Sequence, residues 1–113
     1  MVDKVRFIDV KPLEDACGLL RELYHSDNMS IAHVEVIRDA RKHKHLKMEE
    51  VYYVNKGIGQ LYLGGKVLGI EEGDTIPIPK GTWHYLKKFR DIKLEVLAIT
   101  HPRYDPEDVI FEE

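Results

Sequence analysis

The chain has 113 residues and a formal net charge of −3 at pH 7, with 43% hydrophobic and 33% charged residues. This length is typical of one domain and allows a core without disulfide staples, so we expect a single domain over residues 1–113. The slightly acidic balance argues against a general nucleic-acid binder. We expect no membrane span and no secretory leader. The single cysteine, Cys17, excludes a disulfide framework and favours a reducing cytoplasm.

The first expected strands span residues 5–10 and 19–24. For 19–24 a helix that begins at Pro12 is the alternative, because apolar residues recur there at helical spacing. Gly18 and the turn residues 26–28 favour the strand.

Later strands are expected at residues 29–37, 50–54, 60–63, 66–68, 75–79 and 93–100. Gly64 and Gly65 have the pattern of a two-residue hairpin turn, which needs positive φ. Two prolines place 75–79 at an edge or rim of a sheet. The tail, 101–113, is expected to be an irregular arm that closes the barrel or reaches a partner.

Short strands and frequent turns, with no internal repeat, predict an all-β fold. We expect a small antiparallel β-barrel, or double-stranded β-helix (jelly roll), with a site in its interior. Its core would span about residues 18–100, flanked by an N-terminal strand and the C-terminal arm.

Three histidines and one glutamate form a candidate metal site. His43 and His45 are two residues apart on a predicted strand and therefore share a face. Glu50 opens the next strand, and His84 follows a Pro-x-Gly turn. Imidazole and carboxylate together suit one divalent ion, whether Mn, Fe, Zn, Ni or Cu. A closed structural zinc site is disfavoured because such sites are rich in cysteine.

The two segments resemble the paired motifs of the cupin superfamily, in particular its small single-domain members. The matching residues are His43, His45, Glu50 and Gly57 for the first motif and Gly73, Pro79, Gly81 and His84 for the second. Ile37 replaces a glycine of the first motif, and Lys88 replaces the asparagine of the second. The resemblance covers about residues 18–100 and implies a barrel that binds one metal ion through all four ligands.

Three further residues are candidates for the substrate pocket. Tyr52 is expected on the same face of its strand as Glu50. It either donates a hydrogen bond to a ligand or serves as a core aromatic. Lys88 lies on the inward face of the strand of His84 or extends to solvent. Glu35 is a candidate to point inward from its own strand. Basic residues around the first motif either form a solvated rim or attract an anionic small molecule; they are Arg38, Arg41, Lys42, Lys44 and Lys47.

The function is open among several classes, because one fold carries many chemistries. The cupin resemblance implies a metal-dependent enzyme on a small molecule, similar to sugar-phosphate isomerases. An iron-dependent dioxygenase and a metal-loaded binding module without turnover are the alternatives, so catalysis itself is open. A homodimer is expected because barrels with exposed edge strands tend to pair.

Overall fold

The computed structural model describes residues 4–112, and these contain strands and short 3-10 turns but no α-helix. The strands are β1 (Leu13–Glu14), β2 (Leu19–His25), β3 (Ser30–Glu35), β4 (His43–Lys44), β5 (Glu49–Leu63), β6 (Lys66–Glu71), β7 (Thr75–Ile78), β8 (His84–Lys88), β9 (Leu94–His101) and β10 (Ile110–Phe111). The turns are η1 (Phe7–Asp9) and η2 (Pro106–Asp108). All strand pairs within residues 4–112 are antiparallel, which confirms the predicted fold class. Within residues 4–112 there is no helix suited to crossing a membrane.

The long strand β5 belongs to two sheets. Its first half pairs with β9 and β7, and its second half pairs with β6 and β8. The register against β9 shifts between Val54 and Lys56, and Gly57 follows with a φ of 89°. Such a bulge bends a strand and increases its twist. We predicted separate strands at 50–54 and 60–63, but the structure joins them through this bend.

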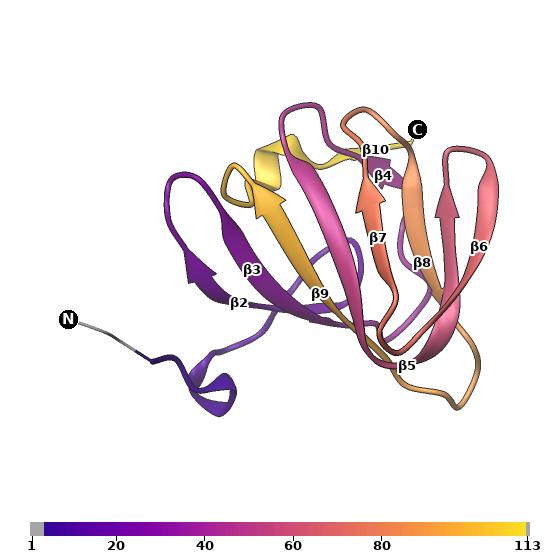
Figure 1. The fold of residues 1–113 in the computed structure, drawn as a ribbon, viewed down its shortest axis with the longest axis horizontal. Helices are drawn as coiled ribbons and strands as arrows, with labels where there is room; N and C mark the ends of the chain where they lie inside the picture. The colour runs from indigo at the N-terminus through magenta and orange to yellow at the C-terminus, as the bar shows by residue number, and fades with distance from the viewer. Residues whose placement is uncertain (1–3, 113) are drawn as a thin grey trace.

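The two sheets curl around one core (Figure 1). The first sheet has the order β1-β2-β3-β9-β5-β7, and the second has the order β6-β5-β8-β4-β10. Alternate residues of β3, β5, β8 and β9 face inward. The most deeply buried apolar side chains are Val54, Leu61, Leu86, Leu94 and Val96.

Several predicted elements are confirmed. Residues 19–24 lie in β2, so the strand is correct and the alternative helix is wrong. The hairpin at Gly64 and Gly65 joins β5 to β6, and both glycines have positive φ. The proline-containing β7 pairs only with β5 among the described strands, as expected of an edge.

The predicted strand at residues 5–10 is wrong. The 3-10 turn η1 occupies this segment, and Ile8 is 85% exposed. The apolar residues there have no neighbouring strand to pair with in the described part of the chain. Phe7 instead packs edge-on against His33, which lies on the outer face of β3.

The C-terminal arm docks on the barrel. Strand β10 pairs with β4, with Ile110 opposite Lys44 and Phe111 opposite His43. In Figure 1 the arm crosses the rim beside β4. Of the two roles expected for the tail, closing the barrel is the one that this structure shows.

Candidate metal centre

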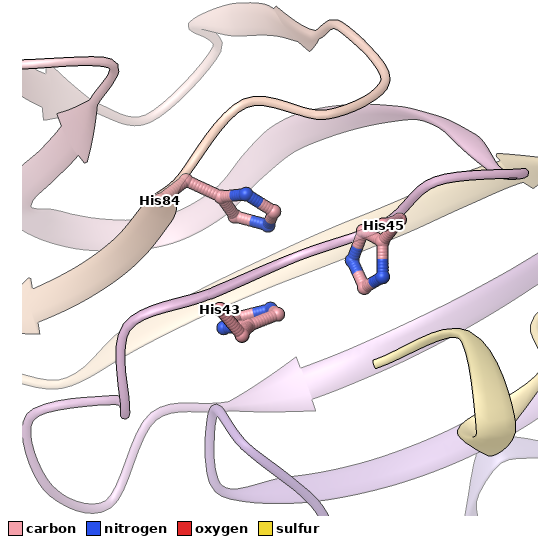
Figure 2. Close-up of side chains that lie close together, drawn as sticks. All are labelled: His43, His45 and His84. Carbon is pink, nitrogen blue, oxygen red and sulfur yellow. The ribbon is translucent and has the colours of Figure 1, made fainter. Parts of the chain in front are cut away.

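The three histidines of the predicted site converge inside the barrel. His43 begins β4, His45 lies just beyond it, and His84 begins β8. His43 and His84 are register partners across the two strands. One ring nitrogen of each histidine lies within 4.8 Å of the others, and all three side chains are buried. Figure 2 shows the rings turned toward one another from two segments far apart in sequence.

A tight turn delivers His84 to the site. The N–H of Thr82 donates to the carbonyl of Pro79 at 3.3 Å, and Gly81 has the positive φ, 75°, that a type II turn requires. The N–H of Gly81 also donates to the carbonyl of His45 at 2.6 Å. This bond ties the turn before His84 to the segment that carries the other two histidines.

Backbone carbonyls orient all three rings. His43 Nδ1 lies 2.7 Å from the carbonyl of Arg41, His45 Nδ1 lies 2.8 Å from that of Asp108, and His84 Nδ1 lies 2.9 Å from that of Thr82. Because a carbonyl only accepts, each Nδ1 carries the proton and donates. The lone pair of each neutral ring is then on Nε2. This arrangement is typical of histidines that bind a metal.

Glu50 lies beside two of these rings. Its Oε1 is 3.3 Å from His45 Nε2 and 3.4 Å from His84 Nε2. Within residues 4–112, neither Glu50 Oε1 nor His84 Nε2 has a hydrogen-bond partner, although both atoms are buried. Buried polar atoms without partners are costly. A divalent cation would satisfy both, and neighbouring ligands on bonds of about 2.1 Å lie about 3 Å apart. The residues present therefore fit a metal ion.

The protonation states of Glu50 and His43 also suit a metal. Burial by itself raises the pKa of Glu50, but contacts with His45 and His84 outweigh burial and lower this pKa to about 2. Burial, assisted by the nearby ring of His84, lowers the pKa of His43 to about 4. At neutral pH Glu50 is ionised and His43 is neutral, and these are the forms that bind metal ions.

Asp108 supports the site, and the sequence analysis did not single it out. Its backbone carbonyl accepts from His45, while its carboxylate accepts the N–H groups of Leu46, Lys47 and Met48, each at 2.9 Å. These hydrogen bonds outweigh the effect of burial and lower the pKa of Asp108. An aspartate in a proline-containing tail is the only sequence signal, and it does not show which distant loop the side chain will hold.

Two neighbouring cavities lie on this side of the barrel, and only the inner one is lined by His43, His45 and Glu50. The inner cavity has a volume of about 20 Å³, enough for about one water. A mouth cavity of about 520 Å³ lies outside it. Five residues line both cavities: Asp15, Ala16, Leu20, Tyr104 and Val109. The two cavities therefore share a wall, and the inner one alone borders the histidines.

The three predicted pocket residues lie in different places. Tyr52 lines the inner cavity, and burial raises its pKa well above its usual value, so its hydroxyl stays protonated. Lys88 lies on the same face of β8 as His84, but its Nζ donates to the carbonyl of Phe89 and it lines neither cavity. It is therefore not brought to the metal centre.

The inward orientation predicted for Glu35 is wrong. Val34 lines the inner cavity, so by alternation Glu35 points to the opposite face of β3. Glu35 is the register partner of Glu95, whose carboxylate contacts His33 at 2.7 Å on that outer face. The loop after β3 prevented this register from being counted in the sequence.

Sequence comparisons give the family. The model of the cupin domain matches residues 30–100. The chain belongs to the cupin family. An uncharacterized protein of Methanocaldococcus jannaschii is 31% identical, over 93% of this chain and 90% of that one. An uncharacterized protein of Aquifex aeolicus is 37% identical, over 60% of this chain and 55% of that one.

Solved structures share this cupin fold at low identity. A protein from Planctomyces limnophilus matches with a TM-score of 0.87 and 21% identity, over 98% of this chain and 97% of that one. The Streptomyces nucleoside dehydratase Pac13 matches with a TM-score of 0.83 and 18% identity, over 100% of this chain and 92% of that one. The polyketide cyclase RemF of Streptomyces resistomycificus matches with a TM-score of 0.83 and 21% identity, over 100% of this chain and 87% of that one. At these identities the likeness shows the fold, and the chemistry has to be argued from the site.

Proposed function

We propose that this cupin is a metal-dependent enzyme acting on a small molecule, with an isomerisation of the sugar-phosphate type as its reaction. The observation that carries the proposal is the unpartnered pair of buried atoms, Glu50 Oε1 and His84 Nε2, beside two further rings whose Nε2 lone pairs are not used by the backbone. A divalent metal bound there supplies Lewis acidity toward a carbonyl or hydroxyl oxygen.

The chain's own residues hold and orient the reactants. His43, His45, His84 and Glu50 are the proposed ligands. Tyr52 is fully protonated at neutral pH and lines the inner cavity, so its hydroxyl is a donor for an oxygen of the substrate. The small volume of the inner cavity excludes bulk water from the reacting end, which strengthens hydrogen bonds and charges there.

The proposed substrate is anionic, because of Arg41 at the mouth. Three arginines line this cavity, and two have carboxylate partners: Arg38 contacts Glu14 at 3.2 Å, and Arg103 contacts Glu22 at 2.8 Å. Within residues 4–112, Arg41 makes no such ion pair. Its guanidinium lies 3.8 Å from the ring centre of Phe111. A planar guanidinium without a carboxylate partner is suited to a phosphate or carboxylate group.

Two lysines of the predicted rim have other partners. Lys42 contacts Glu112 at 2.9 Å, and Lys44 lies 4.5 Å from the ring centre of Trp83. Neither lysine lines the mouth cavity. The solvated-rim interpretation therefore holds for these two lysines, and the anionic ligand is proposed on Arg41 alone.

The experiment is to measure bound metal by elemental analysis, and then turnover of aldose and ketose phosphates, with His84→Gln as the control that lacks one ligand. Metal at about one ion per chain with isomerisation supports the proposal. Iron with consumption of dioxygen would favour the dioxygenase instead. Metal-dependent binding of the compounds without turnover would favour the binding module. A chain that takes up no Mn, Fe, Zn, Ni or Cu would contradict all three. The homodimer and the cytoplasmic location stay predictions.

A further inference from the structure

We propose that Asp15 is the acid–base residue that moves protons on the substrate, an inference that rests on the proposed function. Asp15 lies between β1 and β2, and it lines both the mouth and the inner cavity. It is the only carboxylate that borders both cavities within the described residues. A substrate that spans the two cavities must pass beside it.

The turn around Asp15 holds one carboxylate oxygen and leaves the other available. Oδ1 accepts the N–H of Cys17 at 2.8 Å and the N–H of Gly18 at 3.1 Å. The N–H of Asp15 donates to the carbonyl of Gly18 at 2.9 Å, which closes the turn. Oδ2 makes no hydrogen bond within residues 4–112. The carboxylate is thus oriented by one oxygen, and the other oxygen is the one that can exchange a proton.

The surroundings of Asp15 raise its pKa. Burial is the largest effect, and the two backbone hydrogen bonds oppose it without cancelling it. Among the charged groups that face it, Glu50 raises the pKa and Arg38 lowers it. A general acid–base group works best when its pKa approaches the working pH, so this shift is in the useful direction.

The other titratable groups near the metal centre are less suited to this role. Burial raises the pKa values of Cys17, Tyr52 and Tyr104, so all three stay protonated and cannot accept a proton at neutral pH. Glu50 is engaged by the histidines. Glu35 points to the outer face of β3. Asp15 is the remaining carboxylate that borders the inner cavity.

In the proposed step, Asp15 Oδ2 takes a proton from the carbon next to the substrate carbonyl. The electron pair of the broken C–H bond forms the C=C bond of an enediolate, while the carbonyl oxygen takes the proton of the neighbouring hydroxyl. The carboxylic acid of Asp15 then returns its proton to the former carbonyl carbon. The neighbouring oxygen, which has given up its proton, becomes the new carbonyl. One carbonyl compound is converted to its isomer with no net oxidation and no co-reactant.

The test compares Asp15→Asn with Asp39→Asn in the manganese-loaded full chain, using dihydroxyacetone phosphate in deuterated water as the probe. Asparagine keeps an oxygen for the N–H groups of Cys17 and Gly18, so the variant should fold and keep its metal content. We expect deuterium uptake at carbon to fall at least about 100-fold in Asp15→Asn. Asp39→Asn makes the same change at an exposed aspartate that lines neither cavity, and it should exchange like the wild type.

A second readout does not depend on turnover. The carboxyl carbon of Asp15, followed by ¹³C NMR in the same metal-loaded protein, should titrate above the usual aspartate range. A midpoint within or below that range, or wild-type exchange by Asp15→Asn, overturns the role of Asp15 and leaves the proposed function intact. A wild-type protein that binds manganese but exchanges no deuterium overturns the isomerase and, with it, the role of Asp15.

Discussion

His45 and Asp108 are joined across the rim of the barrel, because the ring Nδ1–H of His45 donates to the backbone carbonyl of Asp108 at 2.8 Å. The carboxylate of the same aspartate accepts three consecutive N–H groups directly after His45. The C-terminal arm thereby sets both the orientation of a proposed metal ligand and the path of its loop. Metal binding and docking of the arm should therefore be coupled.

Replacing Asp108 with Ala should weaken metal binding and destabilise the protein. Three backbone N–H groups lose their acceptor, at a cost of about 1–3 kcal/mol for a buried group left without a partner. The backbone carbonyl that accepts from His45 is kept, but the carboxylate no longer ties the arm to the loop, so this carbonyl should hold the ring less well. Loss of such support typically lowers metal affinity about 10–100-fold. Zinc titration and urea unfolding measure the two effects. Glu107→Ala, an exposed neighbour on η2, is the control. Wild-type affinity in Asp108→Ala would show that the arm does not support the site.

Glu50→Gln should lower metal occupancy, whereas Tyr52→Phe should not. The glutamine lacks the negative charge that balances a cation but keeps nearly the same volume. The phenylalanine removes only a hydroxyl, whose contact within the described residues is Cys17 Sγ at 3.8 Å. Elemental analysis of the two purified variants gives the result. Full occupancy in Glu50→Gln would remove Glu50 from the ligand set.

Arg41→Ala should weaken the binding of inorganic phosphate to the metal-loaded protein by about tenfold, the typical effect of one charged hydrogen bond. The backbone carbonyl that orients His43 is retained in this variant, so metal content should stay constant. Isothermal titration calorimetry measures the change. Lys47→Ala removes an exposed charge that does not line the mouth, and it should bind phosphate like the wild type. Equal affinities for all three proteins would leave no role for Arg41 in anion binding.

Asp15→Asn should change how stability depends on pH. The folded-state pKa of Asp15 is raised from 3.8, chiefly by burial. A carboxyl group with a raised folded-state pKa lowers the free energy of unfolding as pH rises from the unfolded pKa through the folded one. The asparagine variant lacks this loss, so its stability relative to the wild type should increase between acidic and neutral pH. Urea unfolding of chelator-treated protein tests this, and a constant difference across that range would contradict it.

Gly57→Ala should be strongly destabilising, while Gly65→Ala should be mild. Both glycines have positive φ, 89° and 90°, so the backbone strain of an alanine is similar. A Cβ at Gly57 would overlap the carbonyl oxygen of Lys93, whereas a Cβ at Gly65 meets nothing within 4 Å. Backbone strain alone is worth about 1–3 kcal/mol. Urea unfolding of both variants measures the two losses of unfolding free energy. We expect a much larger loss at Gly57, because the bent β5 lies close to the segment before β9 there. Equal losses would contradict this close approach.

Local patterns in the sequence were enough for the strands and for much of the site. Alternation placed His43 and His45 on one face, and turn chemistry placed the hairpin at Gly64 and the turn before His84. These features depend on residues only a few positions apart, so they are readable without the fold. The same alternation does not extend across an irregular loop, which is why the facing of Glu35 was wrong.

The sequence by itself determined an antiparallel barrel and three converging histidines, because side-chain alternation and glycine-dependent turns are local properties of the backbone. The tertiary structure alone decided that Asp108 holds the loop of His45 and that Asp15 lies where the mouth meets the inner cavity. Both residues belong to segments without periodicity, and their partners or surroundings depend on how the chain closes around the core. Hydrogen bonds between such distant segments leave no spacing in the sequence from which they can be predicted.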